Sequence, residues 1–278
     1  QRLSSGETIR REAHYEVDFL WLHTGSYRGN GALRIGGMVE YYLRARASGL
    51  ATCLERPAAV VGSSVHPLAA LAALKWARRL NVPFVFEVRD LWPETLIAFG
   101  RLRERSWTAR AMRALEMHLY RNANQVITLL PGAGEYIASL GIDRSKVVYI
   151  PNGSDSLEPI PARGQTGGGF LFRYVGSLGD ANAVDIVLRA VVHAQATNPG
   201  LDLRLEIIGD GPARRDLEAL AASLGSDRIR FLGSVTKSNV PGLLAGADGL
   251  VMAVRDHPRL YRFGISMNKL FEYLASHR

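Results

Sequence analysis

Short apolar runs alternate with longer segments of helical periodicity along most of this chain, and this alternation limits the possible folds more than any other feature. The runs begin with residues 15–22 and continue at 58–62, 82–88, 125–130 and 146–150, with helical patterns around 34–55, 67–80, 105–123 and 132–140. Such short runs, rich in Val, Ile and Phe, are typical of buried parallel strands. The first half therefore predicts an open α/β sheet with helices on both faces.

A stretch rich in Pro, Gly and polar residues, 151–169, interrupts the alternation as a linker does. Strand patterns then return at 170–176, 201–209, 229–233 and 248–254, with helical patterns near 182–197, 213–224, 237–246 and 266–276. We expect an N-terminal unit over 1–153, a linker over 154–169 and a C-terminal unit over 170–278, each a Rossmann-like, doubly wound parallel sheet. Ligands of such sheets bind at the carboxyl ends of the strands, in the cleft where two units face each other.

Length and composition agree with two domains. At 278 residues and 47% hydrophobic composition, the chain has enough apolar surface for a core in each unit. Cys53 is the single cysteine, which excludes an internal disulfide and a thiolate zinc cluster and fits a reducing compartment. No apolar run is long enough to span a bilayer, and the chain starts with neither Met nor a signal peptide, so we expect an internal fragment of a cytoplasmic protein. The net charge of +8 favours polyanionic partners, whether nucleic acid, anionic lipid or phosphorylated substrates.

Glycine turns follow three strand patterns of the second half, with Gly176 and Gly179 after the first, Gly209 and Gly211 after the second, and Gly233 after the third. Glycine lets the backbone approach a ligand closely, although a lone glycine turn is most often only a turn. Several on one rim, beside the start of a helix, indicate an anionic ligand. Because neither a P-loop nor a dinucleotide G-x-G-x-x-G motif occurs, we expect a nucleotide of another kind.

The last helical pattern, GISMNKLFEYL at 264–274, combines an apolar stripe with a second face that carries Lys269 and Glu272. The stripe consists of Met267, Leu270, Phe271 and Leu274. One interpretation is a weak surface ion pair, since a lysine and a glutamate three residues apart on a helix often pair in solvent. The other is an anion site, because Gly264 and Ser266 open the helix and its first N–H groups suit a phosphate.

Polar side chains also follow strand patterns of the first half: His66 in GSSVHP, and Glu87, Arg89, Asp90 and Trp92 in FEVRDLWPETL. Paired charges beside an aromatic ring suit a sugar or another polar acceptor. Two alternatives stay open, namely that Arg89 and Asp90 only pin their loop and that His66 only starts a helix. No H-E-x-x-H supports a metal site, and no G-x-S-x-G supports a serine hydrolase.

Residues 100–124 combine many arginines with large apolar residues. The arginines are Arg101, Arg103, Arg105, Arg110, Arg113 and Arg121, and the apolar residues include Trp107, Met112, Leu115 and Leu119. Basic and apolar faces on one helix are typical of helices that lie on a membrane surface. The alternative is an ordinary core-packed helix with a solvated basic face.

From about residue 15 to residue 278, the chain resembles the family 4 glycosyltransferases of the GT-B fold, whose two Rossmann-like domains face each other across a cleft. The resemblance is strongest to the branch that builds O-antigen, capsule and exopolysaccharide, including the N-acetylfucosamine-type aminosugar transferases. The segments that carry it are, in chain order, EVRDLWPETL, YIPNG, YVGSLG, IIGDGP, FLGSV and SMNKLFEYLA.

The resemblance implies that the second unit binds a nucleoside-diphosphate-sugar donor, UDP-linked, and that the first binds a polyprenyl-diphosphate-linked sugar or glycan acceptor. In the family pattern Glu272 bonds the ribose, while Asn268 and Lys269 lie near the diphosphate. Ser177 lies in the loop under the phosphates, and Val235 belongs to the segment that contacts the base. The candidate catalytic residues are Asp90, Lys269 and Glu272. The resemblance also implies transfer with retention, without a metal or another cofactor, and a lipid-linked acceptor implies peripheral association with the inner face of an anionic membrane.

The chain departs from the family pattern in several places. Gly264 replaces the first glutamate of the E-x7-E element, Met267 replaces a proline, and Ser177 stands where many relatives carry an arginine. The family's first strand and its last helix have no counterpart, which agrees with a fragment. A GT-B nucleotide-sugar epimerase is the alternative enzyme. A nucleic-acid-binding protein is disfavoured, because the basic residues are scattered and not gathered beside stacking aromatic residues.

Overall fold

The chain forms two compact units. The computed structural model describes residues 9–25, 32–47, 56–154 and 169–278, without the side chains of Ala32 and Leu260. The first unit comprises Gln1–Pro151 and Pro258–Ile265, and the second comprises Asn152–His257 and Ser266–Arg278. The change near residue 152 lies beside the expected boundary, and Cys53 and residues 155–168 of the expected linker lie outside the described residues.

The structure differs from the expected single unit over 170–278, because the segment Pro258–Ile265 packs with the first unit. Phe263 is buried there, and its ring centroid lies 5.1 Å from that of Tyr136. The Phe263 carbonyl also accepts a hydrogen bond from the Gly132 amide at 2.8 Å. A long-range aromatic contact of this kind has no signal in the local sequence pattern.

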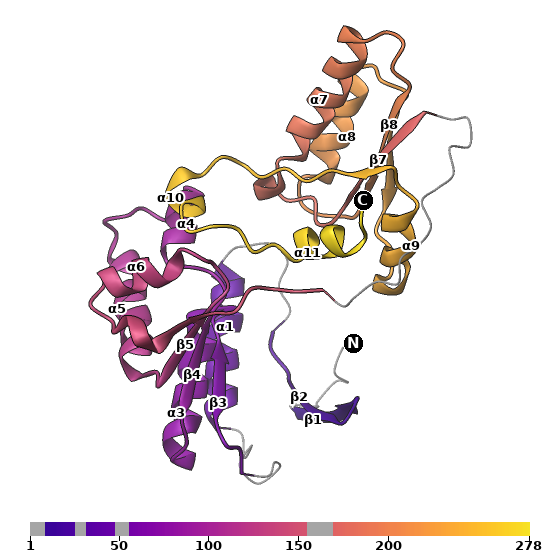
Figure 1. The fold of residues 1–278 in the computed structure, drawn as a ribbon. Coiled ribbons are helices and arrows are strands. Elements are labelled where there is room, and N and C mark those ends of the chain that lie inside the picture. The colour runs from indigo at the N-terminus through magenta and orange to yellow at the C-terminus, as the bar shows by residue number, and fades with distance from the viewer. Residues whose placement is uncertain (1–8, 26–31, 48–55, 155–168) are drawn as a thin grey trace. The chain divides into compact units, whose positions relative to one another are not determined.

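The first unit is built on a parallel sheet with the strand order β3-β4-β5-β6 (Figure 1). Its strands are β3 (Val60–Ser63), β4 (Phe84–Val88), β5 (Gln125–Thr128) and β6 (Val147–Tyr149). Helices α3 (Pro67–Leu80), α5 (Trp107–Asn122) and α6 (Ala133–Ser139) contribute apolar side chains to the core on one face. On the opposite face Val61 and Val148 are 59% and 39% exposed, so the described residues cover that face only in part.

The helices of the first unit agree with the periodicity within a few residues. Helix α1 (Ala32–Ala47) ends where the described residues end, so 48–55 of the expected 34–55 pattern lie outside them. The sequence did not predict α4 (Glu94–Ala98) or α10 (Pro258–Tyr261), which are too short to show periodicity. Helix α3 has sharp ends, since Pro67 occupies its first turn and Asn81 ends it in the left-handed conformation.

The first apolar run, 15–22, does not join the parallel sheet. Strands β1 (Ile9–His14) and β2 (Val17–Leu22) form a separate antiparallel hairpin. Its two turn residues, Tyr15 and Glu16, have φ values of 49° and 65°. Two successive positive φ values match the twist of a tight hairpin, so this run pairs locally and not with β3.

The second unit is a parallel sheet with the strand order β10-β7-β8-β9. Its strands are β7 (Phe170–Val175), β8 (Leu203–Ile208), β9 (Ile229–Gly233) and β10 (Gly249–Leu250). Helices α7 (Val184–Thr197) and α8 (Arg214–Ser223) lie side by side on one face (Figure 1) and bury Tyr174 and Leu205. Helices α9 (Val240–Ala245) and α11 (Asn268–Ala275) cover Val175 and Ile208 on the other face. The expected α/β class with parallel sheets is confirmed.

In the second unit the observed helices and strands differ from the expected ones mainly at short turns and at element ends. Single 3-10 turns, Asp180–Asn182 and Lys237–Asn239, precede α7 and α9. The strand expected over 248–254 is reduced to Gly249–Leu250, because only these residues pair with β7. The helix expected over 266–276 begins at Asn268.

Candidate functional site

The carboxyl ends of β7, β8 and β9 bring the glycine turns of the second unit together. The Gly209 amide donates to the Gly233 carbonyl at 2.8 Å. Gly209 has a φ of 142°, and a Cβ at this position would strike the Gly176 carbonyl. A Cβ on Gly211 would likewise strike the Leu178 carbonyl. Backbone therefore packs directly on backbone, and main-chain groups line this edge.

The other residues of these turns have more room. Ser177 is exposed, and its carbonyl accepts hydrogen bonds from the Tyr174 hydroxyl at 2.7 Å and from Asn182 Nδ2 at 2.9 Å. The nearest neighbour of a Cβ on Gly179 would be 3.7 Å away, so this glycine is not required by packing. Val235 is 38% exposed after β9. The predicted residues of these turns thus share one edge of one sheet.

Lys269 of α11 supplies a positive charge at this edge. Its Nζ lies 3.1 Å from the position of a Cβ on Gly176. It donates to the Tyr174 hydroxyl at 2.7 Å and to Asn182 Oδ1 at 2.6 Å, and it lies 4.5 Å from the centroid of the Tyr174 ring. Burial lowers the pKa of the Lys269 ammonium to about 8. Because its hydrogen-bond partners are neutral oxygens, an incoming anion would stabilise the charged form.

Tyr273 fixes α11 on the sheet. Its hydroxyl accepts from the Val175 amide at 2.7 Å and donates to the Val175 carbonyl at 3.1 Å, so the helix is tied to the last residue of β7. Tyr273 is buried, whereas Leu274 is 66% exposed. The predicted stripe is therefore wrong for Leu274, because the hydroxyl bonds of Tyr273 turn that residue inward. The orientation of α11 that Tyr273 fixes also places Lys269 beside Gly176.

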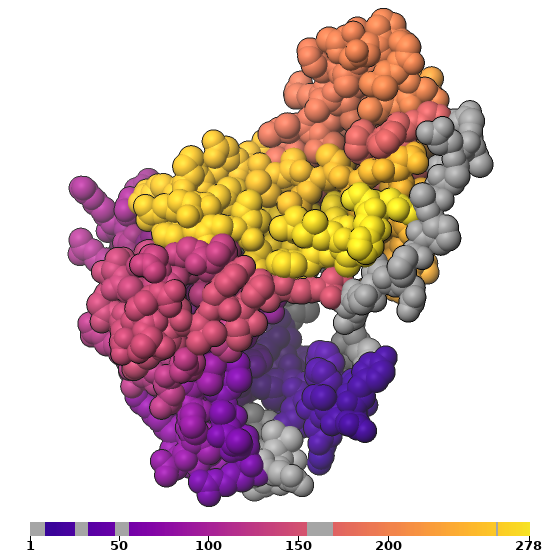
Figure 2. Space-filling view, viewed as in Figure 1, coloured from indigo at the N-terminus to yellow at the C-terminus, as the bar shows by residue number. Residues whose placement is uncertain are grey.

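Glu272 lies about one turn after Lys269 on α11 and lines a hollow of about 450 Å³. The other lining residues are Gly153, Ser154, Lys237, Val240, Pro241, Leu244 and Asn268. The Glu272 carboxylate makes no hydrogen bond or ion pair with a residue that the structure describes, and neither does it pair with Lys269. The alternative of a surface ion pair on α11 is therefore wrong. The yellow C-terminal segment that contains α11 lies at the surface in Figure 2.

Two residues expected at the start of this helix have other roles. The Ser266 hydroxyl accepts from the Asn152 amide at 3.2 Å, and its carbonyl accepts from Asn152 Nδ2 at 2.6 Å, so Ser266 holds the chain where it enters the second unit. Gly264 belongs to the first unit, where its φ is 97° and a Cβ would lie 2.6 Å from the Pro131 ring. The structure therefore does not group Gly264 with the second-unit residues, and a glutamate at this position would clash with Pro131.

Arg255 lies near the start of α7, and two aspartates pair with it. Arg255 NH2 lies 2.8 Å from Asp185 Oδ1 and 3.1 Å from Asp180 Oδ1, and its amide donates to the Ala181 carbonyl. Hydrogen bonds from Arg255 hold the pKa of Asp185 below its usual range. Arg255 therefore braces the loop before α7, and Lys269 is better placed to meet an anion.

In the first unit, Ser64 pins the loop after β4. Its buried hydroxyl accepts from the Arg89 amide at 2.9 Å, and its carbonyl accepts from Trp92 Nε1 at 3.0 Å. Its own amide donates to the Glu87 carbonyl at 2.8 Å. Arg89 and Asp90 are exposed, so the loop is fixed by Ser64 and not by this pair of charges. The sequence reasoning missed Ser64, although a serine after the glycine of a strand end was a signal for a loop contact.

His66 caps α3, because its Nδ1 accepts from the Ala69 amide at 3.1 Å. This confirms the helix-start alternative. Burial, together with the charge of Arg34, lowers the pKa of the His66 imidazole. The same ring lines a hollow of about 630 Å³ whose other walls are largely apolar. Those walls include Met38, Leu68, Trp92, Leu96, Leu102, Trp107, Met112 and Leu115.

The basic stretch 100–124 divides at Trp107, where α5 begins. Arg101, Arg103 and Arg105 are exposed and precede the helix, so the expectation that they lie on it is wrong. Trp107 is 79% exposed beside them, whereas Leu119 is buried in the core. Arg113 pairs with Glu94 at 2.7 Å. The core-packed alternative therefore holds for the end of α5, while its start presents an aromatic ring among arginines.

Within residues 9–25, 32–47, 56–154 and 169–278, no group of three or more His, Cys, Asp or Glu side chains is arranged to hold a metal ion. None of the described helices is both long enough and apolar enough to cross a membrane.

Two family models match the chain. Residues 7–153 match the glycosyl transferase 4-like domain, and residues 169–278 match the glycosyl transferases group 1. Curated relatives include the 2-deoxystreptamine glucosyltransferase of Streptomyces kanamyceticus, 29% identical over 156 residues that cover 50% of this chain and 39% of the relative. Another is the D-inositol 3-phosphate glycosyltransferase of Salinispora tropica, 29% identical over 139 residues, or 42% of this chain and 29% of the relative. The chain thus spans well under half the length of these relatives.

Solved structures show the same fold at low identity. HepE of Anabaena in complex with UDP and glucose has a TM-score of 0.59 and 18% identity over 89% of this chain and 63% of that one. WaaG, a glycosyltransferase involved in lipopolysaccharide biosynthesis, has a TM-score of 0.52 and 16% identity over 86% of this chain and 75% of that one. The expected GT-B fold is confirmed.

Proposed function

We infer the function from the premise that the chain belongs to the glycosyl transferases described by the two family models. We propose that it transfers a sugar from a UDP-linked donor to a lipid-linked or glycan acceptor in the synthesis of bacterial surface polysaccharide. Solved structures of similar fold carry UDP or UDP-glucose, which supports the donor class. Another neighbour is a lipopolysaccharide outer core galactosyltransferase, which supports the polysaccharide role.

The observation that carries the proposal is the position of Lys269 above the main-chain edge of the second unit. Its Nζ lies beside the Gly176 turn and donates to the Tyr174 hydroxyl and to Asn182 Oδ1, and no carboxylate among the described residues pairs with it. A diphosphate at this edge would meet the Lys269 ammonium together with the start of α11. The same charge would stabilise the nucleoside diphosphate as it leaves, with no need for a metal.

Glu272 is the proposed ribose partner. Its carboxylate faces the hollow between α9 and α11, and the ribose hydroxyls are donors that match an acceptor without a hydrogen bond of its own. Asn268 lines the same hollow one turn earlier. Lys269 and Glu272 would then hold two parts of one nucleotide, the diphosphate and the ribose.

The first unit is proposed to bind the acceptor. The apolar hollow beside His66 and Trp92 suits a lipid or sugar face, and Asp90 stays the candidate carboxylate of this unit. The exposed Trp107 among Arg103, Arg105 and Arg110 suits an anionic membrane surface, where each arginine adds about 1 kcal/mol of attraction. Transfer with retention is part of the proposal and is supported by the family resemblance alone. The epimerase alternative is not favoured, because the curated relatives are transferases.

Calorimetry with UDP tests the donor site. Glu272→Ala and Lys269→Ala should each weaken UDP binding by about 1–3 kcal/mol, the cost of removing a charged hydrogen-bond partner. Glu135→Ala is the matched control, because Glu135 is 82% exposed in the first unit. Equal UDP affinity in all variants would refute the assignment. Product analysis with UDP-sugars, with and without acceptor, separates transfer from epimerisation.

Vesicle co-sedimentation tests the membrane surface. Changing Arg103, Arg105 and Arg110 to Glu should abolish salt-sensitive pelleting with anionic vesicles. Changing the exposed Arg189 and Arg215 of the second unit to Glu is the control, since it lowers the net charge elsewhere, by about 4 instead of about 6. Equal pelleting with neutral and anionic vesicles would contradict the proposal.

A further inference from the structure

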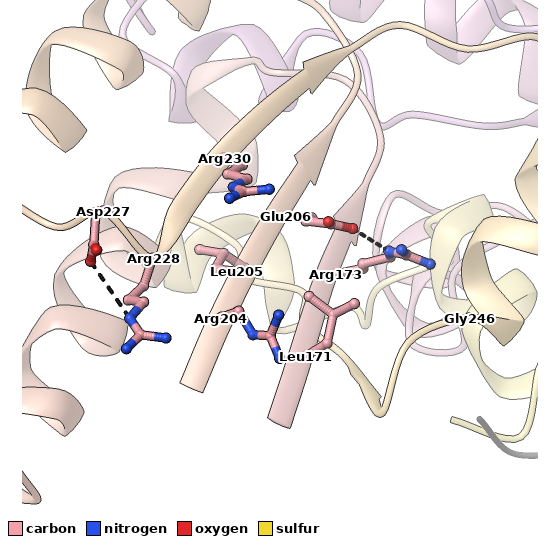
Figure 3. A pocket seen from close by; sticks show the side chains of 9 residues that line it. All are labelled: Leu171, Arg173, Arg204, Leu205, Glu206, Asp227, Arg228, Arg230 and Gly246. Carbon is pink, nitrogen blue, oxygen red and sulfur yellow. Dashed lines mark hydrogen bonds and ion pairs between the residues drawn. The ribbon is translucent and has the colours of Figure 1, made fainter. Parts of the chain in front are cut away.

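The sheet of the second unit carries a second hollow, of about 500 Å³, whose lining is dominated by arginines (Figure 3). Its lining residues are Leu171, Arg173, Arg204, Leu205, Glu206, Asp227, Arg228, Arg230 and Gly246. Figure 3 shows that the labelled charged side chains come from β7, β8, β9 and the residues just before β9. None of the lining residues belongs to the donor or acceptor sites described above.

The strand register explains how these charges meet. Arg173 of β7 lies opposite Glu206 of β8, which in turn lies opposite Arg230 of β9. Arg204 precedes Glu206 by two residues and so shares its face of the sheet. The hollow therefore covers one part of a single sheet face. Further along the same face, Val175 and Ile208 are buried under α9 and α11.

Two of the arginines are already engaged. Arg173 Nε donates to Glu206 Oε2 at 2.7 Å, and its NH1 donates to the Leu243 carbonyl at 2.7 Å. Arg228 NH1 donates to Asp202 Oδ1 at 2.6 Å, and Arg228 Nε lies 3.5 Å from Asp227. These contacts fix the walls of the hollow and give each of its two carboxylates an arginine partner.

The other two arginines keep unused donors. The Nε atom of Arg204 is buried and has no hydrogen-bond partner among the described residues. Arg230 makes no side-chain hydrogen bond or ion pair with a residue in that same part of the chain. A buried donor without an acceptor is costly. An anion between Arg204 and Arg230 would supply the missing acceptor.

This hollow lies at the other end of the sheet from the carboxyl edge at which the nucleotide is proposed to bind. Arg204 is the second residue of β8 and Arg228 precedes β9, so the hollow lies toward the amino ends of the strands. Gly176, Gly209 and Gly233 lie at or just beyond the carboxyl ends of β7, β8 and β9. The two sites are therefore at opposite ends of one sheet. Parallel sheets usually carry apolar side chains on both faces, so a row of arginines on this part of the face requires its own explanation.

We propose that this hollow is a second anion site, which binds the phosphate or diphosphate group of a small polar molecule through Arg204 and Arg230. The planar guanidinium group matches two phosphate oxygens at once, which favours phosphate over a simple monovalent anion. The hollow is large enough for a phosphorylated sugar. No aromatic residue lines it, so the ligand is recognised by its phosphate and not by a stacked base.

Calorimetry with pyrophosphate, inorganic phosphate and glucose 6-phosphate tests the site. The titrations use the Lys269→Ala protein, so that the proposed donor site does not contribute. We expect binding of at least one phosphate probe, and the double variant Arg204→Gln, Arg230→Gln in the same background should weaken it by about tenfold or more. The control Arg189→Gln, Arg215→Gln removes two exposed arginines from the opposite helices and should leave binding unchanged.

Thermal unfolding provides a second measurement that guards against misfolded variants. In phosphate-free buffer the Arg204→Gln, Arg230→Gln protein should be at least as stable as the parent Lys269→Ala protein, because the change at Arg204 removes a buried donor without an acceptor. At matched ionic strength, pyrophosphate should raise the melting temperature of the Lys269→Ala protein and not that of the same protein with Arg204→Gln and Arg230→Gln. The proposal is overturned if no probe binds the parent, or if the double variant binds as tightly as the control. Binding only to phosphatidic acid vesicles would show that a lipid headgroup, and not a soluble molecule, is the ligand.

Discussion

The carboxyl edges of the two sheets are built in different ways. In the second unit the edge is main chain, with Gly209 packed against Gly176 and a lysine above them. In the first unit the edge is held by side chains, with Ser64 bonded to Arg89 and Trp92 and an apolar hollow beside the loop. The edge of the second unit offers a lysine ammonium and the start of α11 to an anion, whereas the edge of the first unit offers shape and apolar surface. The same kind of α/β unit thus supports two kinds of recognition.

The tryptophans allow the two edges to be studied separately. Trp21, Trp76, Trp92 and Trp107 are the tryptophans of the chain, and they all belong to the first unit. Tryptophan fluorescence therefore reports unfolding of the first unit, whereas circular dichroism reports both units.

The largest effect on the second unit is expected for Gly209→Ala. The new Cβ would strike the Gly176 carbonyl at a φ of 142°, so the second unit should lose about 3–4 kcal/mol of its free energy of unfolding. Circular dichroism should show an earlier transition, while tryptophan fluorescence should not change. Gly179→Ala is the control and should cost about 0.5 kcal/mol or less, because its Cβ has room. Equal stability of the two variants would show that the main-chain edge is not tightly packed.

The next effect is a pH dependence of UDP binding. The pKa of Lys269 is lowered to about 8, so above that pH the free protein must take up a proton to present a cation. UDP affinity should then fall by about tenfold per pH unit above pH 8, as linkage requires for one proton. Calorimetry of Lys269→Met should show weak binding without this slope. A slope that persists in Lys269→Met would assign it to another group.

Glu116 is a buried carboxyl of the first unit, and its ionisation should lower the free energy of unfolding of that unit as the pH rises. Burial, assisted by the charge of Glu94, raises the pKa of Glu116 to about 8, against a hydrogen bond from Tyr120 that lowers it. Between pH 4.5 and 8 the folded state keeps a proton that the unfolded state loses. Stability of the first unit should therefore fall as pH rises through this window, by up to about 1.4 kcal/mol per pH unit. Tryptophan-monitored unfolding of Glu116→Gln should lack this fall, and Glu135→Gln should keep it.

The smaller of the two effects on the first unit is expected at Ser64. Ser64→Ala leaves the Arg89 amide without an acceptor and should cost the first unit about 1–2 kcal/mol. Ser63→Ala is a matched control, since the buried Ser63 hydroxyl has no hydrogen-bond partner among the described residues and its loss should be neutral. UDP affinity should stay unchanged in both. If Ser64→Ala weakened UDP binding, the separation of the two edges would be wrong.

Much of the fold was predictable because it depends on local periodicity. The apolar runs at 82–88 and 170–176 became β4 and β7, and the helical pattern over 67–80 became α3 with its expected proline start. The glycine turns were found for the same reason, since their residue types report backbone demands directly. The resemblance then identified the family, which the two family models confirm.

Two parallel α/β units and the positions of their strand-end turns follow from neighbouring residues alone, because the periods of strands and helices are local. The contacts of those turns depend on tertiary packing. Tyr273 turns inward and Leu274 outward because a hydroxyl reaches the backbone of Val175, 98 residues away. Gly264 packs on Pro131, and Arg204 and Arg230 share one hollow because β8 and β9 pair in register. Contacts between distant segments follow from packing and register, and no local pattern encodes them.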